Sequence, residues 1–114
     1  VYQRARDEYP EASFRPEILF QLGECAARLG DADASETVLR ELIQTFPEAT
    51  VAQEALLRIG QILGEQERWK EALETYRELM SRYPESAFFS DALHAAALVA
   101  WARRGHAALS VRGR

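Results

Sequence analysis

The chain has 114 residues, of which 47% are hydrophobic, 28% charged and 10% aromatic. This composition excludes a disordered or collagen-like chain and fits one small folded domain. Fourteen Lys and Arg residues against eighteen Asp and Glu residues give a net charge of −4. A net acidic chain is a poor match for nucleic acid, because a phosphate backbone needs a basic surface.

Neither a membrane span nor a disulfide is expected. The longest apolar stretch without a charged residue, residues 92–102, has eleven residues. A helix needs about 20 such residues to cross a bilayer, so direct membrane insertion is not expected. The one cysteine, Cys25, has no partner within the chain. Packing must therefore stabilise the fold.

An aromatic-proline pair recurs at a constant interval along the chain. Tyr9-Pro10, Phe46-Pro47 and Tyr83-Pro84 follow one another at intervals of 37 residues. A fixed period of this length is typical of repeat architectures. Since proline cannot continue a helix, each pair is expected to close a turn between repeats.

Between these turns the apolar residues recur in steps of three and four, as in Ile18, Leu22, Cys25 and Leu29. This spacing predicts amphipathic helices, two in each period, and no strand pattern competes with it. The five predicted helices cover residues 16–29, 33–45, 51–64, 69–82 and 88–103.

Helix-end signals support these limits. Pro16 suits a first helical position, and Gly30 and Gly105 suit helix ends. Thr50 with Gln53 forms a predicted capping box. Cys25 shares its repeat position with Ile62 and Val99, so it is predicted to be a small buried core residue.

The aligned residues resemble a known repeat family. Leu56, Gly60, Ala72, Tyr76, Leu79 and Pro84 fall at the spacings of the tetratricopeptide repeat signature, and Leu19, Gly23, Ser35, Leu39, Leu42 and Pro47 fall there one period earlier. The chain is therefore similar to that family, with a period of 37 rather than 34 residues and the extra residues in the turn. The resemblance implies an all-α fold, a right-handed superhelical solenoid of antiparallel helix pairs. The small residues at Gly23, Gly60 and Ala97 are expected to let the two helices of a pair approach closely.

The whole chain, residues 1–114, is predicted to form a single domain of such repeats. Residues 1–8 match the end of a preceding repeat, residues 9–45 and 46–82 match two repeats, and residues 83–114 match a partial third, with a second helix beginning near Gly105. We expect a piece of a longer solenoid, whose exposed ends allow self-association. The long turn resembles that of bacterial envelope members, the outer-membrane assembly lipoprotein and the Tol-Pal-associated coordinator, which favours a periplasmic or cell-envelope location over the cytoplasm.

In this family the first helix of each pair lines a concave groove, and the resemblance assigns fourteen residues to it. They are Glu17, Phe20, Gln21, Glu24, Arg28, Glu54, Leu57, Arg58, Gln61, Glu65, Asp91, His94, Leu98 and Trp101. This acidic and partly apolar set suits a peptide or helical segment with apolar anchors and basic flanks. The alternative is that these side chains only keep a helix face solvated. The Lys/Asn clamp for chaperone C-termini does not appear, which disfavours a chaperone adaptor.

Motifs for catalysis are missing from the sequence. His94 and His106 lie twelve residues apart, and no zinc-ligand spacing, phosphate loop or nucleophile motif is present. Carboxylate pairs such as Asp31 and Asp33 fall in predicted turns rather than in a pocket that would shift a pKa. No enzyme activity, metal site or cofactor is expected. Four arginines in residues 103–114, without interleaved aromatics, are interpreted as solvated helix surface rather than a lipid or nucleic-acid site.

The sequence therefore favours a scaffold that binds a protein or peptide partner. A structural unit that assembles end to end is the alternative, and it would depend on terminal residues such as Tyr2 and Leu109 rather than on Phe20 and Leu57. A third possibility is a helical module that regulates a catalytic domain elsewhere in a longer protein.

Overall fold

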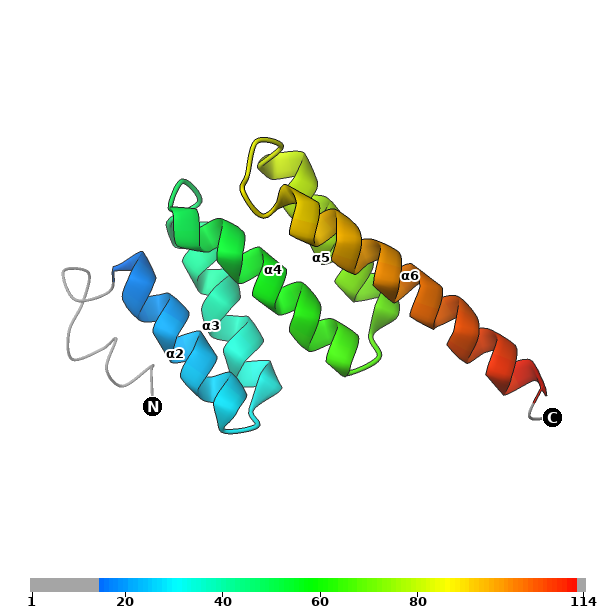
Figure 1. The fold of residues 1–114 in the computed structure, drawn as a ribbon. Coiled ribbons are helices and arrows are strands. Elements are labelled where there is room, and N and C mark those ends of the chain that lie inside the picture. The colour runs from blue at the N-terminus through cyan, green and yellow to red at the C-terminus, as the bar shows by residue number, and fades with distance from the viewer. Residues whose placement is uncertain (1–14, 113–114) are drawn as a thin grey trace. The chain divides into compact units, whose positions relative to one another are not determined.

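The computed structural model describes residues 15–112, and side chains for residues 15–105. Its helices are α2 (Pro16–Arg28), α3 (Ala32–Thr45), α4 (Thr50–Glu65), α5 (Trp69–Arg82) and α6 (Phe89–Arg112), shown in Figure 1. The described part contains no strand, which confirms the all-α prediction. Every predicted helix end but one agrees with the structure to within one residue.

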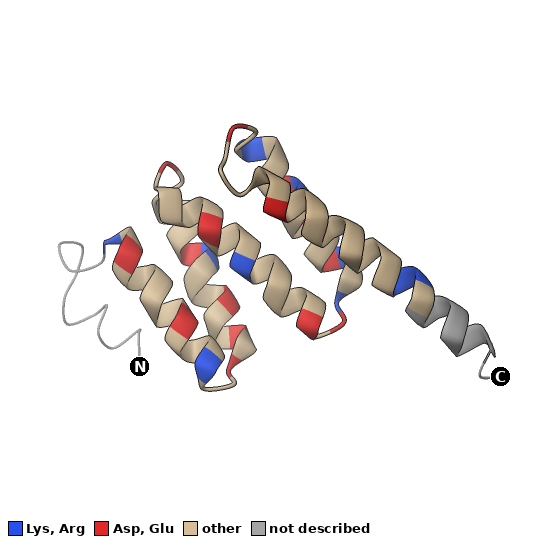
Figure 2. Ribbon diagram, viewed as in Figure 1, with Lys and Arg blue, Asp and Glu red and all other residues tan. Residues whose placement is uncertain are grey.

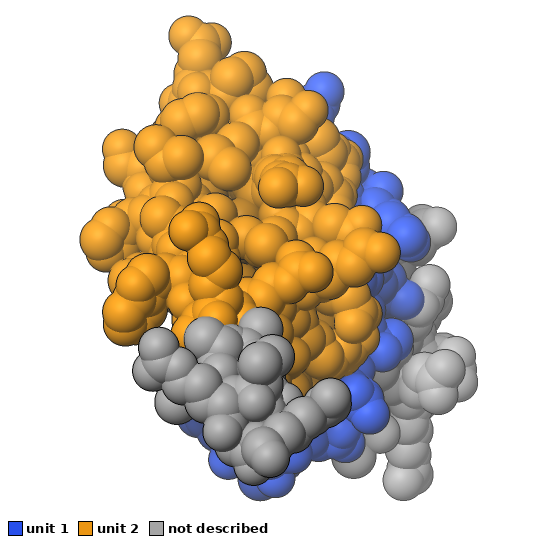
Figure 3. Space-filling view, turned by 90° about the vertical axis from the view of Figure 1, so that its right-hand side faces the viewer, with its two compact units in different colours: residues 1–55 blue, residues 56–114 orange. Residues whose placement is uncertain are grey.

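The chain divides into two compact units, Val1–Ala55 and Leu56–Arg114, which Figure 3 colours separately. The boundary falls inside α4, so the first turns of this helix belong to one unit and the rest to the other.

In the first unit α2 packs against α3. The contact is close at Gly23, where a Cβ atom would lie 2.7 Å from Cδ2 of Leu39. The core also contains Leu19, Val38, Leu42 and Ile43. Gly23 therefore lets the two helices approach, as the sequence predicted, because Leu39 fills the space a side chain would need.

In the second unit α5 packs against α6, and α4 contacts both. A Cβ atom at Gly60 would lie 2.3 Å from Cε1 of Tyr76, and one at Gly64 would lie 3.7 Å from Cγ2 of Val99. The core of this unit is apolar and comprises Leu56, Ile59, Ile62, Leu63, Ala72, Tyr76, Leu79, Ala92 and Val99.

Two helix ends are closed in the same way, 37 residues apart. Gly30 has a φ of 83°, and the N–H of Asp31 donates to the carbonyl of Ala26 at 2.9 Å. Glu67 has a φ of 61°, and the N–H of Arg68 donates to the carbonyl of Leu63 at 2.9 Å. Both are Schellman ends, with a left-handed residue directly after the helix cap.

The start of α3 shows what one of the predicted turn carboxylates does. Asp31 is the N-cap residue of this helix, and its Oδ1 accepts the N–H of Ala34 at 3.1 Å. The start of α4 differs from the prediction, because Thr50 is already helical and so does not occupy the N-cap position of a capping box.

The prediction for Cys25 is wrong, because this residue is exposed, whereas the equivalent Ile62 is buried. The same face of α2 exposes Ile18 and leaves Leu29 86% exposed. The buried residues of α2 are Leu19 and Gly23, on the side that meets α3. A repeat helix buries its second face only against a neighbouring repeat, and periodicity reports the pattern without showing whether that neighbour is present.

The predicted end of the last helix is also wrong. Instead of stopping near residue 103 and restarting as a second helix, α6 runs continuously through Gly105 to Arg112. A glycine inside a helix costs only about 1 kcal/mol relative to alanine, and no proline follows to stop the chain. Gly105 and His106 therefore lie within α6 rather than at a boundary.

Several sequence predictions lie outside the described residues. They are the turn at Tyr9-Pro10, the assignment of residues 1–8 to a preceding repeat and the side chain of Leu109.

Candidate partner-binding surface

The groove residues predicted on α2 lie on one side of that helix. Each of Glu17, Phe20, Gln21, Glu24 and Arg28 lies three or four residues from another member of the set, which places them on one side of the helix. The first, third and last are exposed, and Phe20 and Glu24 are half-buried. All five are therefore accessible from outside the α2–α3 core.

The groove residues predicted on α4 are less exposed than those on α2. Glu54, Leu57 and Arg58 are half-buried, and Gln61 and Glu65 are exposed. None of the five belongs to the buried core. On this helix the core residues are Ala52, Ala55, Leu56, Ile59, Ile62 and Leu63. Leu57 therefore keeps part of its apolar side chain accessible, outside the buried core.

The groove residues predicted on α6 are all exposed. Asp91, His94 and Leu98 follow one another at helical spacing, and Trp101 is 75% exposed. Large exposed apolar side chains at helical spacing are characteristic of surfaces that bind another protein. Of this set, Leu98 and Trp101 supply most of the apolar surface.

The charge of the predicted set is mainly acidic. It contains five carboxylates, at positions 17, 24, 54, 65 and 91, against the guanidinium groups of Arg28 and Arg58. Figure 2 shows acidic segments along α2, α4 and the start of α6. An acidic surface with apolar side chains favours an occupant with basic and apolar groups.

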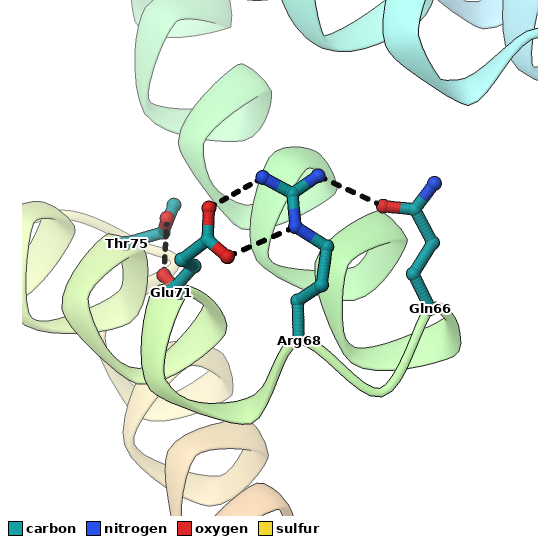
Figure 4. Close-up of polar contacts among 4 residues, drawn as sticks. All are labelled: Gln66, Arg68, Glu71 and Thr75. Atoms are coloured by element: carbon teal, nitrogen blue, oxygen red, sulfur yellow. Dashed lines mark hydrogen bonds and ion pairs between the residues drawn. The ribbon is translucent and has the colours of Figure 1, made fainter.

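A polar cluster at the turn between α4 and α5 was not predicted from the sequence (Figure 4). Nε of Arg68 donates to Oε1 of Glu71 at 3.0 Å, a second N–H of the guanidinium pairs with Oε2 of Glu71, and Nη1 donates to Gln66 at 3.1 Å. The hydrogen bond from Arg68 holds the pKa of the Glu71 carboxyl below its ordinary value. The signal available in the sequence was the opposite charges at i and i+3. This cluster links the end of α4 to the start of α5 and contains none of the predicted groove residues.

One other group has a shifted pKa. Burial raises the pKa of the Tyr76 phenol, and the negative charge of Glu65 raises it further. The shift reflects the place of this ring in the core, against Gly60.

The part of the chain that the structure describes offers neither a cluster of metal ligands nor a membrane-spanning helix. No group of three or more His, Cys, Asp or Glu side chains there could hold a metal ion. Within the same residues, no helix is both long enough and apolar enough to span a bilayer.

Comparison with known proteins gives one match. The tetratricopeptide repeat profile matches residues 17–49 and 54–86, which is more than half of the chain. No curated protein and no solved structure matches. The two matched segments each contain a helix pair, α2 with α3 and α4 with α5. The resemblance to bacterial envelope members stays a prediction.

Tetratricopeptide repeats generally serve as protein-protein interaction modules and are typically non-enzymatic scaffolds. With two repeats matched, all helix ends but one in the predicted places and glycines at the close helix contacts, this chain belongs to the tetratricopeptide repeat family.

Proposed function

We propose that this chain binds an extended or helical segment of a partner protein in a concave groove lined by α2, α4 and α6. The groove would arise from right-handed superhelical stacking of the helix pairs. The observation that carries the proposal is the accessibility of the predicted set: none of its fourteen side chains is buried, although α2, α4 and α6 each bury another face.

The chemistry of the set specifies the occupant. The apolar members, Phe20, Leu57, Leu98 and Trp101, would receive apolar side chains of the segment. The carboxylates around them would pair with Lys or Arg residues on its flanks. The partner segment is therefore expected to be basic and amphipathic, and its affinity is expected to fall as salt is added.

The test combines partner capture with direct binding. The wild-type chain and a Phe20→Ala/Leu57→Ala variant, both checked for folding by circular dichroism, are used for affinity capture, and the retained protein is identified by mass spectrometry. Its candidate segment is then synthesised and titrated against both chains by fluorescence anisotropy. Loss of two anchors should weaken binding at least about tenfold.

An Ile18→Ala/Leu29→Ala variant is the matched control, because it removes two exposed aliphatic groups from α2 outside the predicted groove set. It should leave the affinity within about twofold of wild type. Equal weakening by both variants would contradict groove binding, as would full retention of the segment by the Phe20→Ala/Leu57→Ala variant.

End-to-end assembly is the second candidate, and the exposed apolar side chains on the outer helices favour it. Ile18 and Leu29 on α2, and Leu93 on α6, are accessible at the two ends of the described chain. Sedimentation velocity at increasing protein concentration separates the candidates. Assembly predicts larger species that the Ile18→Ala/Leu29→Ala variant suppresses, whereas groove binding predicts one species with either chain.

A further inference from the structure

Within the second unit, the part of α4 from Leu56 onward and α6 use equivalent faces differently. Leu56 of α4 is fully buried, and the residue one turn later, Gly60, receives the ring of Tyr76. The equivalent residues of α6, 37 positions on, are Leu93, which is 56% exposed, and Ala97, which is also exposed. On α4 this face packs against α5. The equivalent face of α6 is exposed, with none of the described residues covering it.

This face continues into a shallow cavity between α5 and α6. The cavity has a volume of about 280 Å³ and is lined by Leu73, Ala100, Arg103 and Arg104. On α6, Ala97, Ala100 and Arg104 are spaced as residues of one helix face. The cavity therefore combines apolar walls with two guanidinium groups, at the end of the uncovered face.

Both charged side chains that line the cavity are basic. Lys70 and Arg77 precede and follow Leu73 by three and four residues, so they lie on its side of α5, and both are exposed. The cavity itself is lined by Arg103 and Arg104, while Lys70 and Arg77 lie at neighbouring positions of α5 with the exposed carboxylate of Glu74 between them. Figure 2 shows the basic segment of α6.

We propose that this cavity, together with Leu93 and Ala97, is a second docking site, which binds an acidic amphipathic segment of a partner protein. An apolar side chain of the segment enters between Leu73 and Ala100, and its carboxylates pair with Arg103 and Arg104. Arginine suits this role because its planar guanidinium pairs with carboxylates bidentately and packs over apolar groups. The site has the opposite charge preference to the groove and does not depend on it.

The test uses a defined probe. A fluorescein-labelled helical peptide of about 16 residues carries leucines at i and i+4 with glutamates around them, and a second peptide has lysine in place of every glutamate. Anisotropy is measured with the wild-type chain at about 50 and about 300 mM salt. We expect binding of the acidic peptide alone, weakening as salt is added.

Two substitutions and one matched control locate the site. Arg104→Glu should weaken the acidic peptide about tenfold, and Leu73→Ala about fivefold. Arg15→Glu makes the same change of charge at an exposed position in the other unit and should change the affinity less than twofold. Circular dichroism melts check that each variant is folded.

A second readout is independent of affinity. In a Trp69→Phe background the remaining tryptophan, Trp101, is 75% exposed and borders Ala97 on α6. Its emission should shift to shorter wavelength when the acidic peptide binds. The groove variant Phe20→Ala/Leu57→Ala should bind this peptide as the wild type does.

Four outcomes would overturn the proposal. The first two are equal binding of both peptides and an equal loss of affinity in the Arg15→Glu and Arg104→Glu variants. The third is tighter binding to phosphatidylserine vesicles than to the acidic peptide. The fourth is release of the labelled peptide when added unlabelled protein self-associates. The last two would assign the surface to an anionic membrane or to a second copy of this chain.

Discussion

Gly60 and Gly64 lie one turn apart on α4, yet the structure gives them opposite roles. The Cβ position of Gly60 lies against the buried ring of Tyr76, while that of Gly64 lies at ordinary contact distance from Val99. The first glycine is required by packing, whereas the second only costs the helix conformational entropy.

Gly60→Ala should therefore destabilise the protein and Gly64→Ala should stabilise it. We expect a loss of about 1 to 3 kcal/mol for the first, because a buried aromatic ring cannot move aside, and a gain of up to about 1 kcal/mol for the second. Urea denaturation of the two variants checks this. Stabilisation by Gly60→Ala would show that Tyr76 can repack.

Ser35 occupies a position where the next repeat has Ala72, and both residues are fully buried. The hydroxyl oxygen of Ser35 has no hydrogen-bond partner among the described residues. A buried polar atom without a partner costs about 1 to 3 kcal/mol.

Ser35→Ala should accordingly raise the free energy of unfolding by about 1 kcal/mol, since it removes the unpaired hydroxyl and keeps the Cβ atom that packs in the core. The thermal midpoint should rise with it. A lower midpoint for Ser35→Ala would mean that the hydroxyl is satisfied in solution.

At the scale of elements, the two Schellman ends differ in the type of residue at the left-handed position. The left-handed position after α2 is Gly30, whereas the equivalent position after α4 is Glu67. A residue other than glycine adopts this conformation at a cost of about 1 kcal/mol. Among the described residues, Glu67 is the one non-glycine residue in this conformation.

Glu67→Gly should stabilise the second unit by about 0.5 to 1 kcal/mol, and Gly30→Ala should destabilise the first by a similar amount. Chemical denaturation with both variants measures the two signs. Gly30 has open space around its Cβ position, so a loss there would come from backbone conformation alone.

At the scale of the whole molecule, a repeat protein gains its stability from neighbouring helices rather than from one central core. Leu39 in the first unit and Leu79 in the second are both fully buried. Substitutions at these two leucines therefore test the stability of different units of the chain.

Leu39→Ala and Leu79→Ala should each cost about 2 to 5 kcal/mol locally. Hydrogen exchange should become faster mainly in α2 and α3 for the first variant, and mainly in α5 and α6 for the second. An equal loss of protection throughout the chain in both variants would indicate one cooperative body instead.

The sequence by itself determined the helical class, the 37-residue period and nearly all helix limits, because these depend on local spacing, proline and glycine. It also located Gly23 and Gly60 as close contacts, since a small residue at a repeated core position implies a close neighbour, but the same prediction is wrong for Ala97, which is exposed. Tertiary structure decided which apolar faces have a partner. Cys25 and Leu93 match buried residues in other repeats, yet both are exposed, because burial depends on contacts between helices that a repeat pattern does not report. The cavity beside Leu73 likewise depends on contacts between α5 and α6 that one-dimensional periodicity does not encode.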